Sequence, residues 1–349
     1  MAAATPSSAI SAHLAVRPDW LATRREPALE PELPIIDPHH HLIDRPESGT
    51  YLLRDIMADI DSGHNIVATV YLEWLSMYRA QGPVEMRPVG EIEFANGVAA
   101  MCASGGYGAP RVCAGIVGHG ELTLGARVEP VLEAMIAAGN GRFRGIRFIT
   151  ASDPDQALWG SVVGRPQGWL LDKTVREGFT RLAPLGLSFD AFMYHSQLGD
   201  LLDLARTFPQ TPIVLNHVGG AIGLGRYAGK RDEVFADWRA KIRNLAACPN
   251  VHVKLGGMGM KMFGFDFHEG AQPPTSERLA AAWRPYVETC VEAFGAKRAM
   301  FESNFPVDKG SYSYGVFWNA CKRLARGASA EEKANLFHGT ASRFYRLGL

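Results

Sequence analysis

Eight short apolar stretches rich in β-branched residues recur along this 349-residue chain, and longer stretches with helical spacing of apolar residues separate them. These stretches are residues 33–41, 64–74, 110–118, 143–149, 186–194, 212–220, 251–258 and 298–307. Such alternation predicts repeated β-α units and a parallel sheet. Because eight units are the number in a TIM barrel, we predict an α/β fold: a single-domain (β/α)8 TIM-like barrel.

An open doubly wound sheet is the alternative architecture. That fold usually carries a Gly-rich phosphate-binding turn after its first strand, whereas histidines occupy this turn here. Helix signals are clearest at 127–140 and at 276–295, which Ser276 opens and Gly295 closes. Residues 1–30 are expected to form a flexible or surface-laid arm, and residues 31–349 the barrel.

Composition narrows the class of ligand. The chain carries 36 basic and 36 acidic side chains, so it lacks the basic excess that binding to nucleic acid or an anionic membrane requires. No stretch has 18 consecutive apolar residues, and no signal peptide is recognisable. The five cysteines are scattered without a CxxC pair, which favours reduced thiols and a cytoplasmic location. We therefore expect a small-molecule substrate and leave a homo-oligomer open.

The stretch "IIDPHHHL", residues 35–42, ends the first predicted strand with three histidines. Because side chains alternate along a strand, His39 and His41 should share one face with Asp37, while His40 points the other way. At the carboxyl end of a barrel strand, the His39 and His41 imidazoles could bind a metal ion or polarise a carbonyl oxygen.

Other polar residues mark the ends of later strands. His217 ends the sixth strand and precedes two glycines, which favours a place at the barrel mouth. His195 follows the fifth strand and is either functional or a polar residue at a helix start. Arg147 ends the fourth strand, where it could polarise a carbonyl group or pair with Glu73 or Asp190.

Three long connections, roughly 75–90, 219–231 and 257–275, should leave the same face of the barrel. Bulky residues on and beside them predict either a lid over an apolar or aromatic substrate or an oligomer contact. The residues predicted to bind substrate are Glu73, Trp74, Tyr78 and Met258.

Together these motifs resemble the amidohydrolase superfamily, in the branch that includes 2-pyrone-4,6-dicarboxylate lactonase and L-fuconolactone hydrolase. The resemblance runs from "IIDPHHH" through "FRGIR", "VLNHVGG" and "VHVKLGG" to "MFESNFPVD" and "LFHGTASRFYRL". It implies that His39 and His41 match the first-strand HxH of the family and that His217 matches its sixth-strand histidine. In many members these positions bind one divalent metal, here expected as zinc or manganese, and some lactonases work without a metal.

The chain departs from the family pattern at the eighth strand, where Asn304 replaces an aspartate that takes a proton from the attacking water. An amide cannot act as that base, and its oxygen is a weaker ligand than a carboxylate. The substitution leaves metal-independent catalysis open. Asp308, His195 and His217 are the candidate replacements for the base.

The combined interpretation is hydrolysis of a lactone or related carbonyl ester. His39, His41 and Arg147 would polarise the carbonyl group, and His195, His217 or Asp308 would act as the base that assists water. Asn304 completes the predicted set of catalytic residues. A metal-dependent decarboxylase of an aromatic or unsaturated acid, and a barrel that binds a ligand without turnover, are the alternatives.

Overall fold

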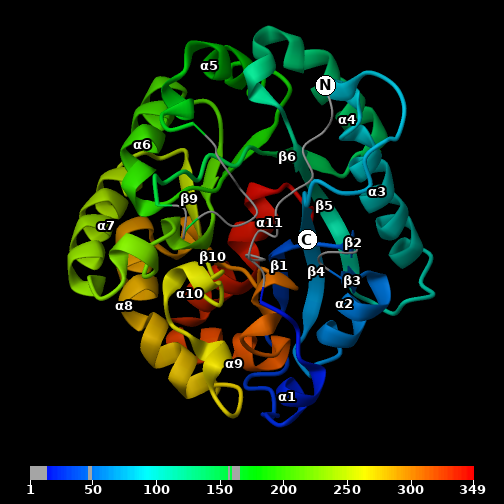
Figure 1. Cartoon of the computed structure of the whole chain (residues 1–349). Helices are drawn as coiled ribbons and strands as arrows, with labels where there is room; N and C mark the ends of the chain where they lie inside the picture. The colour runs from blue at the N-terminus through cyan, green and yellow to red at the C-terminus, as the bar shows by residue number, and fades with distance from the viewer. Residues whose placement is uncertain (1–13, 46–48, 156–157, 159–165) are drawn as a thin grey trace, which may run out of the picture.

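The computed structural model describes residues 14–45, 49–155, 158 and 166–349. Its main sheet has eight parallel strands in the order β1-β4-β5-β6-β7-β8-β9-β10 (Figure 1). The strands are β1 Ile35–His40, β4 Ile66–Leu72, β5 Arg111–His119, β6 Phe143–Arg147, β7 Ser188–Ala191, β8 Ile213–Leu215, β9 Val251–Leu255 and β10 Ala299–Phe301. Backbone hydrogen bonds from Asn304 to His39 and from His41 to Phe305 join the ends of this order. The predicted TIM-like barrel is confirmed, and each of the eight strands overlaps one of the eight predicted apolar stretches.

Helices surround the strands on the outside (Figure 1). They are α2 Leu53–Ile60, α3 Val89–Ala103, α4 Glu129–Ala138, α5 Lys173–Phe179, α6 Leu198–Thr207, α7 Arg231–Ala246, α8 Ser276–Phe294 and α9 Tyr314–Leu324. The short α10 Ala330–Ala334 and α11 Thr340–Phe344 follow them in the chain, and α11 lies at one end of the barrel interior. The Thr275 hydroxyl accepts from the Arg278 amide and caps α8, while Gly295 ends it at a positive φ of 72°.

A small hairpin of β2 (Ile43–Arg45) and β3 (Gly49–Tyr51) was not predicted, because three-residue strands carry too few residues for a readable period. In the segment expected as an arm, residues 1–13 lie outside the described residues, and Pro18–Ala22 forms α1. The Glu26 carboxylate accepts hydrogen bonds from the Ser276 amide and hydroxyl, so the described part of this segment is fixed to the start of α8.

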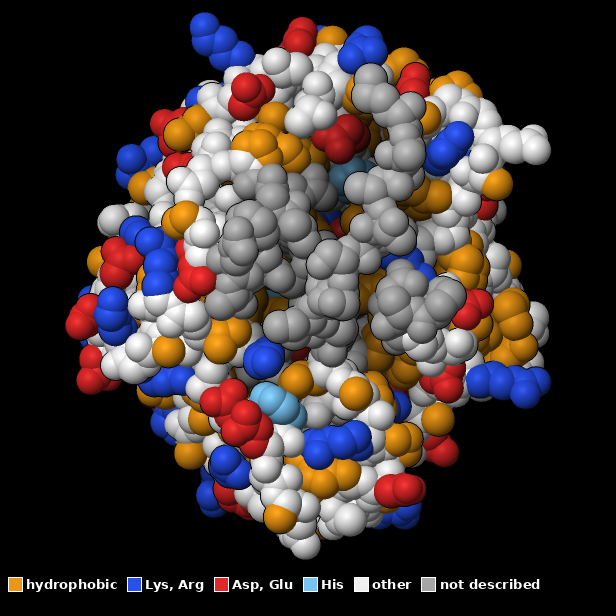
Figure 2. Space-filling view, viewed as in Figure 1, with side chains coloured by type: hydrophobic (Ala, Val, Ile, Leu, Met, Phe, Trp, Pro, Cys, Tyr) orange, Lys and Arg blue, Asp and Glu red, His pale blue; other side chains and the backbone are white. Residues whose placement is uncertain are grey.

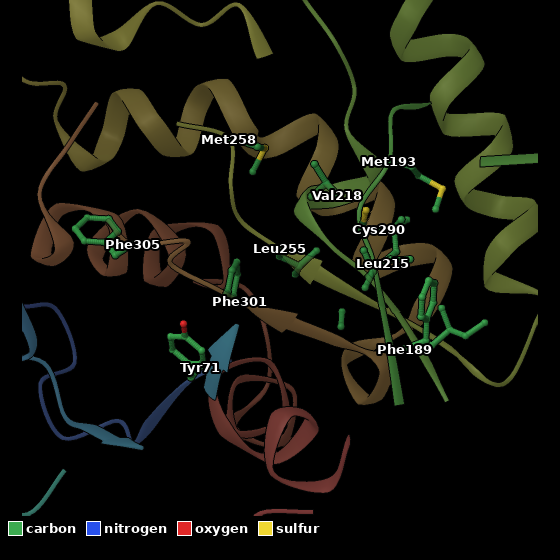
Figure 3. Packing of buried hydrophobic residues seen from close by; sticks show 14 of the residues in the cluster. Tyr71, Phe189, Met193, Leu215, Val218, Leu255, Met258, Cys290, Phe301 and Phe305 are labelled. Carbon is green, nitrogen blue, oxygen red and sulfur yellow. The ribbon is translucent and has the colours of Figure 1, made fainter. Parts of the chain in front are cut away.

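The larger hydrophobic cluster lies between the strands and the helices. Figure 3 shows Leu215, Leu255 and Phe301, from the neighbouring strands β8, β9 and β10, close to Cys290 of α8. Their outward-facing positions alternate with inward-facing ones along each strand. All five cysteines are buried and unpaired, as predicted.

A second apolar cluster fills one end of the barrel interior. It joins residues from opposite sides of the ring, Val70 of β4 and Val214 of β8, to Phe344 and Tyr345 at the chain's end. Such a contact is made inside the barrel, and Figure 1 shows α11 at the centre of the ring. The C-terminal segment therefore closes this end of the interior, and the polar residues of the strands lie toward the other end.

In the described part of the chain, the helices are all too short or too polar to cross a membrane. Side chains of both charges are interspersed over the face shown in Figure 2. This distribution agrees with the equal numbers of acidic and basic residues.

Candidate active site

The end of β1 sets the direction of the histidines. The pairing of β1 with β4 shifts register between Asp37 and His40, because Pro38 has no N–H to donate to the ladder. The shift corrects one expectation: Asp37 does not share the face of His39 and instead accepts hydrogen bonds from the Tyr314 and Ser303 hydroxyls. His40 contacts the Thr69 hydroxyl at 2.8 Å, while His39 and His41 face each other as predicted.

His39 and His41 present unprotonated nitrogens to one another. The His41 Nδ1 lies 2.9 Å from the Leu72 carbonyl oxygen, and the His39 Nδ1 lies 2.5 Å from Glu302 Oε2. The Leu72 oxygen is an acceptor, and Glu302 lies closer to the His39 Nδ1 than the Lys254 Nζ does at 3.4 Å, so we assign the proton of each ring to Nδ1 and a lone pair to each Nε2. The two Nε2 atoms are 3.2 Å apart. Two facing lone pairs at this distance repel unless a cation or a donor hydrogen lies between them.

Glu302 orients two imidazoles at once. Its Oε1 lies 2.7 Å from the His217 Nδ1 and accepts from the His217 amide at 2.9 Å, while its Oε2 faces His39. His217 and Val218 both have positive φ, 52° and 47°, a strained turn of the kind found at functional sites. A Cβ on Gly257 would lie 2.2 Å from the His217 Nδ1, so glycine there makes room for the ring.

Burial decides the charge of the first-strand imidazoles. It lowers the pKa of both His39 and His41 well below the ordinary value, and the positive charges of Lys254 beside His39 and Arg147 beside His41 lower them further. Both rings are therefore neutral at pH 7, the form that can bind a metal ion.

Charged side chains enclose the imidazoles in pairs. Arg147 Nε donates to Glu73 Oε1 at 2.6 Å, which leaves Arg147 Nη1 at 3.4 Å from the His39 Nε2. Lys254, fully buried, lies 2.7 Å from Asp190 and 3.9 Å from Glu302. The two basic side chains, Arg147 and Lys254, therefore pair with three acidic ones, Glu73, Asp190 and Glu302.

Asn304 is connected to the carboxylate that follows it. Its Nδ2 donates to Asp308 Oδ1 at 2.8 Å, and Asp308 Oδ2 accepts from the Gly259 amide and from the Tyr312 hydroxyl. Burial raises the pKa of Asp308 to about 7, although these hydrogen bonds oppose the shift. A carboxyl group with this pKa can exchange a proton near neutral pH.

The residues predicted to bind substrate lie in different surroundings. The half-buried Trp74 indole packs on the His41 ring, with centroids 4.6 Å apart, and Glu73 is engaged by Arg147. The half-buried Tyr78 belongs to the same loop, whereas Met258 is buried in the large hydrophobic cluster (Figure 3).

His195, which follows β7, contacts the loop that follows β8: its amide donates to the Gly220 carbonyl oxygen at 3.0 Å. The Ile222 amide approaches its Nδ1 at 3.4 Å, and the Tyr227 ring lies 4.9 Å from the His195 ring. The Lys241 Nζ of α7 also donates to the His195 carbonyl oxygen at 3.3 Å. Burial lowers the pKa of His195 from its ordinary value.

Glu302 is the residue that the sequence-based site omitted, together with its neighbours Lys254 and Asp190. All three are fully buried polar residues near the ends of predicted strands. That position is a usable signal, but it does not say which residues meet across the barrel. One ligand atom each from His39, His217 and Glu302 lie within 4.8 Å of one another, so this set could hold an ion, with Glu302 in place of the His41 of the predicted set.

A model of the Amidohydrolase family matches residues 36–347, and the chain belongs to this family of enzymes. A full-length relative is the uncharacterized protein y4mH of Sinorhizobium fredii, which is 35% identical over 90% of this chain and 99% of its own. An L-fucono-1,5-lactonase of Burkholderia ambifaria is 28% identical over 60% of this chain and 63% of its own length. The predicted membership of the amidohydrolase superfamily is confirmed.

The solved structures agree on the fold. An amidohydrolase from Burkholderia multivorans, crystallised with bound zinc, matches with a TM-score of 0.68 and 23% identity. The match covers 89% of this chain and 99% of that one.

Proposed function

We propose that this protein hydrolyses a lactone of a small organic acid, by attack of water on a carbonyl group held at His39, His41 and Arg147. The observation that carries the proposal is the separation of 3.2 Å between the His39 and His41 Nε2 atoms, with the Arg147 Nη1 at 3.4 Å from the His39 Nε2. The L-fucono-1,5-lactonases among the relatives support a lactone as the substrate class.

The geometry also suits a divalent metal ion. Two imidazole nitrogens on one tetrahedral zinc ion lie about 3.3 Å apart, close to the separation of the His39 and His41 Nε2 atoms. His39, His41 and His217 would hold the ion, and Glu302 would fix the orientation of two of these rings. The zinc in the Burkholderia multivorans amidohydrolase supports this assignment. When bound, such an ion polarises a carbonyl oxygen and lowers the pKa of a water molecule.

The side chains have separate tasks in the proposed reaction. Arg147 Nη1 donates to the substrate carbonyl oxygen and stabilises the negative charge that develops there. Glu73 holds the Arg147 guanidinium in place through a 2.6 Å contact. The Trp74 indole, which packs on His41, borders the substrate ring.

Asp308 is the proposed general base in place of the family aspartate. Asn304, which stands where the family has its aspartate, donates a 2.8 Å hydrogen bond to the Asp308 carboxylate. In this chain Asn304 would therefore orient the base and Asp308 would take the proton. Because the pKa of Asp308 is raised to about 7, its ionised form is basic enough to take a proton from water. The leaving alkoxide then receives this proton.

The test begins with elemental analysis of protein expressed with added zinc or manganese and purified without chelator. The same preparation is assayed against γ- and δ-lactones of sugar acids and against aromatic carboxylic acids. Formation of a carboxylate from a lactone, lost in His39→Asn, supports the proposal. Release of carbon dioxide would identify a decarboxylase instead, and thermal stabilisation by a lactone without turnover would identify a binding protein.

A further inference from the structure

Glu91, in the first turn of α3, collects the hydrogen bonds of the loop that follows β4. Its Oε1 accepts from the amides of Trp74 at 2.7 Å and Ser76 at 3.2 Å and from the Tyr71 hydroxyl at 2.9 Å. Among the described residues, its Oε2 has no hydrogen-bond partner. One carboxylate oxygen therefore holds the backbone amides on both sides of Leu75, whose own amide donates to Glu73 Oε2 at 3.2 Å.

The loop needs this support because its backbone is strained. Leu75 and Met77 have positive φ, 54° and 57°, a region that side chains other than glycine rarely occupy. Gly90 lets the loop approach α3 closely, since a Cβ there would lie 2.6 Å from the Met77 carbonyl oxygen. Two adjacent residues of α3 thus hold the backbone that presents Trp74.

We propose that Glu91 is a positioning residue: by holding residues 74–76 through Oε1, it keeps the Trp74 indole against His41. The inference rests on the proposed function where it assigns Trp74 to the edge of the substrate. It adds a residue on an outer helix that acts through the loop without touching the reacting atoms. A strained loop keeps one conformation when its surroundings fix it from several directions, and here Glu91 provides several of the contacts.

The loop is held by the hydrogen bonds that Glu91 Oε1 accepts, and a negative charge on Glu91 is not required for them. Burial and the neighbouring Glu73 carboxylate raise the pKa of Glu91 to about 7, so part of the population is protonated at neutral pH. Since Oε2 has no partner among the described residues, the proton is best placed there, and Oε1 still accepts. Glutamine can supply the same acceptor oxygen and is the conservative variant.

The experiment compares Glu91→Leu, Glu91→Gln and Glu93→Leu in the full chain. Glu93 lies two residues further along α3, is exposed and pairs with Arg79, so it is a matched control. We expect Glu91→Leu to lower kcat/KM for a lactone about tenfold or more, because misplacing one wall of a site is costly. Glu91→Gln should restore most of the activity, and Glu93→Leu should leave it unchanged.

A second measurement requires no substrate. Acrylamide quenching of tryptophan fluorescence, compared with and without Trp74→Phe in each background, isolates the Trp74 signal. We expect greater quenching of Trp74 in Glu91→Leu and wild-type quenching in Glu91→Gln and Glu93→Leu. If Glu91→Leu does not fold, Glu91→Asp, which is one methylene shorter, should give the same change in smaller measure.

These outcomes separate the two proposals. Unchanged Trp74 quenching in a folded Glu91→Leu or Glu91→Asp variant would overturn the positioning role, whatever the substrate is. Equal losses in Glu91→Gln and Glu91→Leu would also overturn it, because charge rather than the acceptor would then matter. Absence of lactone turnover by the wild-type protein would instead contradict the proposed function and leave the quenching test intact.

Discussion

The two ends of the barrel interior differ in chemistry although the same strands build both. Met300 and Glu302 are two residues apart on and just after β10, and the first belongs to the apolar cluster while the second holds His39 and His217. The same step leads from Val214 to Asn216, which donates to the buried Asp190. A shift of about 7 Å along each strand therefore separates the part that stabilises the fold from the part proposed to do chemistry.

This contrast has an energetic meaning. The apolar end gains free energy from burial, whereas the polar end pays for desolvating its charges and recovers that cost through close pairs such as Lys254 with Asp190. Removing a side chain at the apolar end should affect mainly stability. A change at the polar end should affect activity, stability or both, according to whether a partner is left buried without compensation.

The largest expected effect is on activity, from His39→Asn. It removes one of the two facing Nε2 atoms, so we expect a loss of about a thousandfold in kcat/KM together with loss of any bound zinc or manganese. His252→Asn is the control, because His252 is an imidazole on β9 that packs on Phe344 of the apolar end. Steady-state kinetics and elemental analysis check both. Comparable losses of kcat/KM in His39→Asn and His252→Asn would contradict the assignment of activity to the polar end alone.

Lys254→Met tests the pairing of charges. It leaves Asp190 buried beside Asn216 and Tyr345 without its cation, so we expect about 3 kcal/mol less stability towards urea. The double variant Lys254→Met with Asp190→Leu should regain only part of that stability, because the Asn216 amide and the Tyr345 hydroxyl lose their acceptor, and it should be inactive because the charge of Lys254 beside His39 is gone. Regained activity would mean that the polar end does not depend on this pair.

Asp308→Asn tests the proposed base. We expect kcat/KM to fall about a hundredfold, and the wild-type pH profile to rise through pH 7 as the Asp308 carboxyl loses its proton. Because the Tyr312 hydroxyl lowers the pKa of Asp308, Tyr312→Phe should move that rise to higher pH. A pH profile that is the same in wild type and in Tyr312→Phe would argue for a different base.

Much of the fold follows from the sequence because apolar runs of strand length carry their own signal. Strand alternation also predicts that His40 points away from the face shared by His39 and His41. The register shift at Pro38 could not be predicted, since it depends on how β1 pairs with β4. The meeting of Glu302 with His39, 263 residues apart in the chain, depends on closure of the barrel, which no local pattern contains.

Tyr345→Phe gives the smallest expected effect, and it falls on the boundary between the two ends. The Tyr345 ring belongs to the apolar cluster, while its hydroxyl donates to Asp190 at 2.8 Å. Removing the hydroxyl costs one hydrogen bond to a charged group that keeps Lys254 and Asn216 as partners, so we expect about 1–2 kcal/mol less stability and nearly unchanged kcat/KM. Urea unfolding and kinetics on the same preparation measure both. A large loss of activity with little loss of stability would show that the polar end extends to Tyr345, because the hydroxyl would then act through Asp190 and Lys254 on His39.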